Sequence, residues 1–117
     1  MKIAVVGGRD FNDYELLKSE MVKFIKENNN IQALVSGGAK GADSLAERLA
    51  VELSIPIQVF KPDYKRFGRA ATLVRNTEIV EHSDVIFAFW DGKSKGTHDT
   101  IKKAQKAEKI VMIVNYR

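Results

Sequence analysis

Residues 36–43 form a short glycine-rich turn that also carries a serine, a lysine and an aspartate. The turn follows an apolar run at residues 31–35 and precedes a helical pattern that begins near Ser44. Glycines let a backbone approach a bound group closely, and the amides that open a helix are unpaired donors with a partial positive charge. The turn therefore predicts a site for an anion, such as a phosphate or another oxygen-rich group of a nucleotide.

Polar residues suited to the same chemistry follow the other apolar runs. An arginine can grip a phosphate through two hydrogen bonds, an aspartate can accept hydrogen bonds from sugar hydroxyls, and a tryptophan can stack on a base. The ligand-binding residues that we expect are Gly7, Gly8, Arg9, Asp10, Ser36, Gly37, Gly38, Lys40, Gly41, Asp43, Arg75, Asn76, Trp90, Asp91, Ser94, Gly96 and Thr97.

Each candidate also has a structural interpretation that the sequence leaves open. The glycines of residues 36–43 could serve only a tight strand-to-helix turn, and Asp43 could cap the helix that follows. Arg9 and Asp10 could form a solvent-facing ion pair. Trp90 is equally suited to core packing.

Two familiar phosphate signatures are absent. The dinucleotide fingerprint G-x-G-x-x-G fails because residues 7–10 are followed by no further glycine, and residues 36–41 begin with a serine. Residues 92–94 imitate the end of a Walker A loop, but Phe87 occupies the position of its first glycine. The chain has no cysteine and only two histidines, so we expect no metal site and no required cofactor.

The elements that must position these residues alternate along the chain. Apolar runs at residues 2–6, 31–35, 57–60, 85–90 and 110–114 predict strands, nearly all buried on both faces. Helical patterns lie between them at residues 14–25, 45–53, 70–80 and 101–107. We therefore expect a single α/β domain over residues 1–117, a three-layer Rossmann-like fold with a doubly wound parallel sheet of five strands in the order 3-2-1-4-5.

Local chemistry suggests where some of these elements end. Asn12, with Glu15 three residues later, predicts the start of the first helix, and the asparagines at 28–30, which tolerate left-handed geometry, predict its end. Residues 61–68 are expected to form an irregular surface loop. In open parallel sheets, ligands bind beyond the carboxyl ends of the strands. The glycine-bearing loops after the first, second and fourth strands should therefore line one crevice.

Composition limits the partners of the chain. Lysine and arginine exceed aspartate and glutamate by 19 to 15, a net charge of +4 that mildly favours anionic partners. No segment approaches the ~20 apolar residues of a membrane span, so a soluble, cytoplasmic protein without a membrane partner is expected.

Several loops together resemble a known family. The motifs are Val-Gly-Gly-Arg-Asp-Phe at 6–11, Val-Ser-Gly-Gly-Ala-Lys-Gly-Ala-Asp at 35–43, Arg75-Asn76, and Phe-Trp-Asp-Gly at 89–92 with Gly-Thr at 96–97. They are similar to the YspA/YpsA-related branch of the SLOG superfamily, which also includes the DprA (Smf) proteins and the LOG nucleoside-monophosphate phosphoribohydrolases. The resemblance covers essentially the whole chain and implies a nucleotide-like ligand over the glycine loops.

The resemblance does not imply one reaction. LOG enzymes carry P-G-G-x-G-T-x-x-E, whose glutamate assists cleavage of the bond between base and ribose phosphate. Aligned on Gly96-Thr97, this chain has Thr100 at the position of that glutamate, and Asp99 is one residue away, a rotation of about 100 degrees on a helix. Gly92, Lys93 and Ser94 stand in place of the P-G-G, and Gly96-Thr97 is still expected to open a helix that can bind phosphate without the acid.

Three hypotheses follow. The first is a module that binds a nucleotide or an NAD- or ADP-ribose-like molecule, for sensing or sequestration. The second is an enzyme that hydrolyses an N-glycosidic or phosphoribosyl bond, with Asp43, Asp91 or Asp99 orienting water. The third, related to DprA, is single-stranded nucleic-acid binding by the basic stretch at residues 61–75. Related proteins commonly pair, and a homodimer is expected.

Overall fold

The computed structural model describes residues 1–116, which form a parallel five-stranded sheet with the order β3-β2-β1-β4-β5. The fold class and the strand order are those predicted. The strands are β1 (Lys2–Gly7), β2 (Ala33–Ser36), β3 (Ile57–Val59), β4 (Val85–Trp90) and β5 (Ile110–Asn115). The helices are α1 (Tyr14–Glu27), α2 (Ala42–Glu52), α3 (Tyr64–Phe67), α4 (Ala71–Glu81) and α5 (Lys95–Lys106), with a 3₁₀ turn at Gly68–Ala70.

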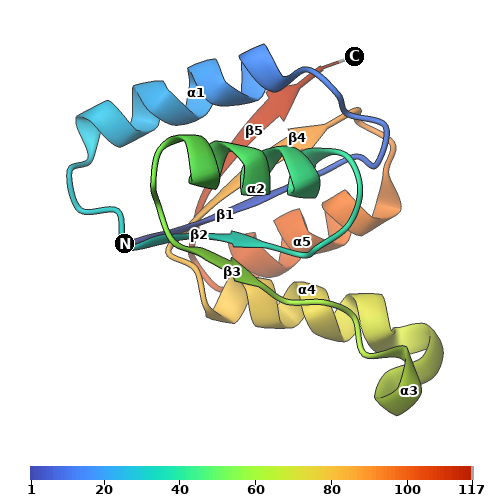
Figure 1. The fold of residues 1–117 in the computed structure, drawn as a ribbon. Coiled ribbons are helices and arrows are strands. Elements are labelled where there is room, and N and C mark those ends of the chain that lie inside the picture. Colours follow the sequence, from blue (N-terminus) through green and yellow to red (C-terminus); the bar gives the residue numbers. More distant parts are fainter. Residues whose placement is uncertain (117) are drawn as a thin grey trace.

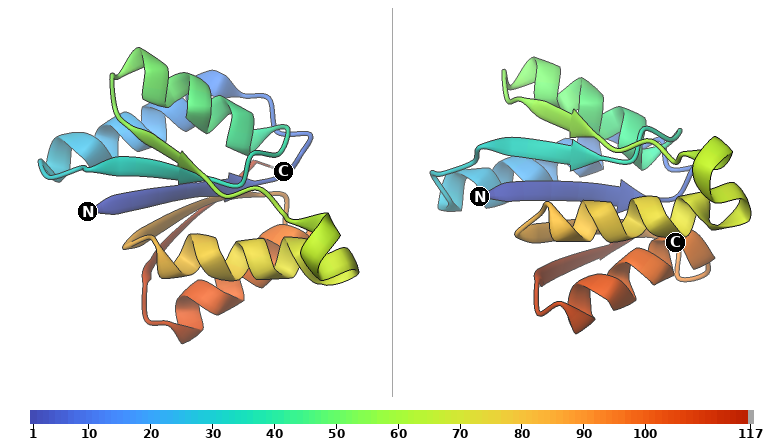
Figure 2. Two further views of the ribbon diagram at one scale, coloured as in Figure 1. Left: turned by 60° about the horizontal axis from the view of Figure 1, so that its bottom comes forward. Right: turned by 90° about the horizontal axis from the view of Figure 1, so that it is seen from below.

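Helices cover both faces of the sheet (Figure 1), with α1 and α2 on one side and α4 and α5 on the other, as Figure 2 shows from two further directions. Successive side chains of a strand point to opposite faces, so β1 supplies both cores. Ile3 and Val5 belong to the core under α1 and α2. Ala4 and Val6 belong to the core under α4 and α5. The central strand is therefore apolar and buried from Ile3 to Val6.

The outer strands differ from the prediction of burial on both faces. Ile110, Met112 and Ile113 of β5 are 55%, 40% and 44% exposed, and Val59 of β3 is 37% exposed. An outermost strand has a neighbour on one edge only, and here the helices lie mainly over the central strands. The apolar run of β5 therefore reaches the surface.

One local detail of α1 is also corrected. Its N-cap is Asp13, whose carboxylate accepts a hydrogen bond from the Leu16 amide at 3.0 Å, rather than Asn12. The charged cap also complements the positive end of the helix dipole. At the other end, the helix ends at Asn28 as expected, with Asn28 in extended geometry at φ −134° and its side-chain amide donating to the carbonyl oxygen of Phe24 at 2.9 Å.

The expected irregular loop at residues 61–68 contains the short helix α3 and runs into the 3₁₀ turn. Asp63 caps α3 by accepting from the Arg66 amide at 3.1 Å. In Figure 1, α3 projects beyond the first turn of α4 at the carboxyl edge of the sheet. None of the helices in residues 1–116 is long and apolar enough to cross a membrane.

Candidate functional site

A cleft of about 470 Å³ lies beyond the carboxyl ends of β1, β2 and β4. We call it the central cleft. The loops after these strands and the facing sides of α4 and α5 form its walls. The expected site residues that line it are Gly7, Gly8, Arg9, Asp10, Asp43, Arg75, Asn76, Asp91, Ser94, Gly96 and Thr97. The predicted convergence of loops at this edge is therefore present.

Gly41 joins two of these loops. It has φ +76°, and a Cβ on it would lie 2.2 Å from the carbonyl oxygen of Gly8 and 2.7 Å from the backbone of Arg9. The next amide, that of Ala42, donates to the same Gly8 oxygen at 3.3 Å. Gly41 does not line the cleft, and its lack of a side chain lets the turn after β1 rest on the start of α2.

Ser36 has a similar internal role. It is fully buried, and its hydroxyl accepts a hydrogen bond from the Gly38 amide at 3.1 Å. The hydroxyl also lies 3.3 Å from the carbonyl oxygen of Asp43. The serine hydroxyl thus bonds to both ends of the glycine-rich turn, and Ser36 does not line the central cleft.

Asp43 is a buried carboxyl group in the wall of the cleft. It is 6% exposed, and its Oδ2 accepts a hydrogen bond from the Ala39 amide at 3.1 Å. Burial raises the pKa of Asp43 to about 6, although the Ala39 amide and the charge of Arg75 act in the opposite direction. The group therefore changes its charge near neutral pH, which is unusual for an aspartate.

Arg75 and Asn76 connect α4 to the glycine-rich turn after β2 and to the start of α5. The Arg75 guanidinium donates to the carbonyl oxygen of Gly37 at 2.6 Å and to Asn76 Oδ1 at 3.0 Å. Asn76 Nδ2 in turn lies 3.1 Å from Asp99 Oδ2 and 3.4 Å from the carbonyl oxygen of Gly96. Asn76 is buried although it lies within a helix, and these bonds explain how a weak helix former is accommodated there.

The acid candidates of α5 and the preceding loop are engaged in the structure. Asp99 bonds to Asn76 and forms an ion pair with Lys103 at 2.9 Å, and it does not line the central cleft. Thr100 lines the cleft instead, and its hydroxyl donates to the carbonyl oxygen of Gly96 at 3.3 Å. Asp91 Oδ1 accepts from the amides of Lys93 and Ser94, both at 2.8 Å.

The first turn of α5 opens into the central cleft through Gly96 and Thr97. Its amides have no intrahelical acceptor and lie at the positive end of the helix dipole. No Cβ added at Gly96 would meet an atom within 4 Å, so the space before this turn is open. Arg75 lines the same cleft, so two sources of positive potential face one volume.

Trp90 does not line the cleft. Its indole N–H donates to the carbonyl oxygen of Ser94 at 3.0 Å, and its ring stacks on His98 with centroids 5.4 Å apart and planes 4° apart. The ring is also packed against the core under α4 and α5. One face of the indole is therefore already covered by a side chain.

The model of the YspA, cpYpsA-related SLOG family matches residues 1–67, which is more than half of the chain and includes the loops after β1 and β2. The chain belongs to this SLOG family. The Gene 61 protein of Mycobacterium phage D29 is 27% identical over 121 residues, covering 98% of this chain and 95% of the phage protein.

Two solved structures share the fold of this chain. DNA processing protein A (DprA) of Streptococcus pneumoniae superposes with a TM-score of 0.77 and 20% identity over 99% of this chain and 50% of its own. DprA of Helicobacter pylori, a single-stranded DNA-binding protein, gives a TM-score of 0.70 and 24% identity over 100% of this chain and 66% of its own. The SLOG chain thus spans only half to two thirds of these DprA proteins.

The remaining residues that the sequence predicts to bind a ligand lie in a second hollow, also of about 470 Å³. We call this hollow the side groove. It is lined by Gly37, Gly38 and Lys40 of the glycine-rich turn and by Pro62 and Tyr64 before and within α3. Lys40 therefore lies outside the central cleft.

Sequence reasoning missed several lining residues of the central cleft. They are Val6, Ala39, Thr72, Ile79 and Thr100. These residues are small, apolar or weakly polar, so their types carry no chemical signal. A helical projection of α4 could have found some of them, since Thr72, Arg75, Asn76 and Ile79 share one face at three- and four-residue spacing. Among residues 1–116, no three His, Asp or Glu side chains gather as a metal site would require.

Proposed function

We propose that the protein binds a nucleotide or a nucleotide-derived molecule in the central cleft. The observation that carries this proposal is that the first turn of α5 and the guanidinium of Arg75 face the same cleft. Unpaired helix amides and a fixed arginine are a common combination for phosphate. Membership of the SLOG family is consistent with a nucleotide-related ligand.

The other walls of the cleft suit the rest of a nucleotide. Val6 and Ile79 supply apolar surface for a ring, and both belong to the core under α4 and α5. Asp10, Asn76 and Asp43 supply acceptors for sugar hydroxyls or base edges. A cleft that combines apolar walls with a few fixed polar groups is typical of small-molecule sites.

Hydrolysis of an N-glycosidic or phosphoribosyl bond is the second candidate, and Asp43 is the observation that favours it. A buried carboxyl with a pKa of about 6 in a cleft is suited to accept a proton from water near neutral pH. Its Oδ2 is held by the Ala39 amide, whereas the acid position of the LOG motif holds Thr100. We propose binding without cleavage as the main function.

A titration panel separates these functions. The full chain is titrated by calorimetry with AMP, GMP, CMP, UMP, NAD and ADP-ribose, and parallel incubations are analysed by chromatography for free base. We expect saturable binding of at least one nucleotide and no released base. Release of base that is lost in Asp43→Asn would establish the enzyme instead. An absence of binding by every nucleotide would overturn both.

Single-stranded nucleic acid is the third candidate, favoured by the fold shared with DprA. Binding of an oligothymidylate through the basic residues at 61–75 would weaken steeply as salt increases. Neutralising Lys65, Arg66 and Arg69 together would then remove it. We expect instead that neutralising these exposed side chains leaves nucleotide affinity unchanged, because none of them lines the central cleft or the side groove.

We further propose that two copies pair through β5. Within residues 1–116, β5 is an outermost strand with one edge beyond the sheet, and it carries the exposed Ile110, Met112 and Ile113. An exposed apolar edge is a hazard that proteins usually cover. Antiparallel pairing with the same strand of a second copy would satisfy the edge and obey twofold symmetry.

A further inference from the structure

The central cleft and the side groove meet along a common wall. Arg9, Ala39 and Arg75 line both of them. The side chain of Ala39 is only a methyl group, so the two arginines are the charged side chains that both hollows share. We call this shared, positively charged boundary the waist.

Arg75 cannot leave this waist easily. Its guanidinium is held by the carbonyl oxygen of Gly37 at 2.6 Å and by Asn76 Oδ1 at 3.0 Å. These bonds use its Nη1 and Nε atoms, and Nη2 has no hydrogen-bond partner among residues 1–116. A fixed guanidinium with donors to spare suits an anionic group at the junction of the two hollows.

Two glycines and two ring-bearing residues line the side groove, namely Gly37, Gly38, Pro62 and Tyr64. The glycines present only backbone to the groove. Gly38 has φ +72°, and a Cβ there would lie 2.9 Å from Val59 and 3.0 Å from Lys61, so the turn packs closely on the end of β3.

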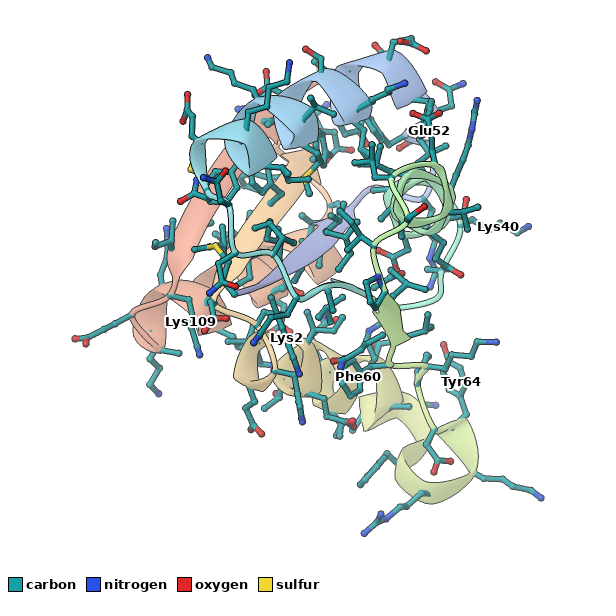
Figure 3. All side chains as sticks on the ribbon, turned by 60° about the vertical axis from the view of Figure 1, so that its left-hand side comes forward. Lys2, Lys40, Glu52, Phe60, Tyr64 and Lys109 are labelled. Atoms are coloured by element: carbon teal, nitrogen blue, oxygen red, sulfur yellow. The ribbon has the colours of Figure 1, made fainter. Side chains whose placement is uncertain are left out.

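Tyr64 forms one side of this groove. It is 59% exposed, and its ring has no hydrogen bond, aromatic contact or ion pair among the described residues. An exposed tyrosine that lines a groove with two glycines is suited to stack on a base. Figure 3 shows Tyr64 and Lys40 on the same side of the molecule, on α3 and just before α2. Lys40 lines the same groove and adds to its positive potential.

We propose that the side groove is a second nucleoside subsite, so that the ligand has two nucleoside halves joined by a pyrophosphate. One half occupies the central cleft, the pyrophosphate lies at the waist between Arg9 and Arg75, and the second base stacks on Tyr64. This inference rests on the proposed function and specifies the class of its ligand. A mononucleotide would fill only the central cleft.

The test compares mononucleotides with their dimers. The full chain is titrated with AMP, GMP, CMP and UMP and with the corresponding symmetrical pyrophosphate-linked dinucleotides. We expect the preferred dinucleotide to bind at least tenfold more tightly than its mononucleotide, because stacking a second base adds about that much. Tyr64→Ala should remove this advantage while mononucleotide affinity stays unchanged.

Matched variants identify the origin of the advantage. Tyr64→Phe should retain it, since the ring is kept and only the hydroxyl is lost. Lys40→Ala should reduce the affinity for the dinucleotide by a few fold, whereas Lys106→Ala, at the exposed end of α5, should not. Circular dichroism and thermal unfolding of each variant confirm that it is folded.

The possible failures are distinguishable. Equal affinity for mononucleotides and dinucleotides, or a dinucleotide advantage that survives Tyr64→Ala, overturns the second subsite and leaves the proposed function intact. In another outcome, a twelve-nucleotide oligothymidylate binds tightly in a way that depends on Tyr64, and the dinucleotide has no advantage over the mononucleotide. That result assigns the groove to single-stranded nucleic acid instead. Absence of all nucleotide binding overturns the proposed function and the subsite together.

Discussion

The guanidinium of Arg75 donates to the carbonyl oxygen of Gly37 at 2.6 Å, so a side chain of α4 is tied to the turn that follows β2. The two residues are 38 positions apart in the sequence. A Cβ on Gly37 would lie 2.5 Å from the same guanidinium, so the close approach also requires a glycine. This contact places a positive charge between the central cleft and the side groove.

Substitution of Arg75 should weaken ligand binding. Arg75→Ala deletes the charge and its hydrogen bonds, and loss of a charge-assisted bond of about 1.5–3 kcal/mol weakens the preferred nucleotide at least tenfold. Arg75→Lys should restore little, since the single nitrogen of an ammonium cannot occupy the separate positions of Nε, Nη1 and Nη2. Calorimetry measures both. Arg69→Ala, an exposed arginine outside both hollows, is the control, and an equal loss there would contradict a local role.

Asp43 should make the protein less stable as the pH rises from about 4 to about 6. The folded carboxyl has a pKa of about 6 against 3.8 for the free group, so the folded state binds more protons over this window. Stability therefore falls with rising pH, by about 3 kcal/mol for a shift of roughly two pKa units. The free energy of unfolding in urea is measured for wild type and for Asp43→Asn at pH 4 and at pH 8. We expect the gain in stability from Asp43→Asn to be larger at pH 8 than at pH 4. A difference that does not change with pH would contradict the raised pKa.

Gly41 and Gly96 should respond oppositely to alanine. Gly41→Ala places a methyl group 2.2 Å from the Gly8 carbonyl oxygen at φ +76°, and we expect a loss of about 2 kcal/mol or more. Gly96→Ala meets nothing within 4 Å and lies in α5, where alanine is the better helix former by up to about 1 kcal/mol. Chemical denaturation provides both values. A tolerated Gly41→Ala would show that the two loops can separate without cost.

The β5 edge should govern self-association. Met112→Lys introduces a charge on the exposed edge strand and should convert the dimer to a monomer, as measured by light scattering coupled to size exclusion. Val51→Lys is the matched control, because Val51 is 80% exposed but lies on α2. A wild-type monomer at all concentrations, or a dimer that persists in Met112→Lys, would contradict pairing through β5.

Regularities of short range explain what could be predicted. Apolar runs such as residues 85–90 indicate central strands because both of their faces are buried, and their alternation with helices indicates a doubly wound parallel sheet with right-handed crossovers. The order 3-2-1-4-5 is one of the few common orders of such a sheet. The same reasoning failed for β5, whose run is equally apolar but lies at the edge of the sheet. It also failed at residues 61–68, where Asp63 caps a helix too short to leave a periodic pattern.

The sequence alone determined the fold class, the strand order, the family resemblance and the loops that meet at one edge of the sheet, because these depend on local patterns and on the geometry of parallel sheets. Only the tertiary structure decided which side chains of those loops face a cavity. In the structure, Ser36 and Asp99 form internal hydrogen bonds, and His98 covers one face of Trp90. Tyr64 and Gly38 line the same groove. These outcomes depend on contacts between residues far apart in the chain, which no local pattern records.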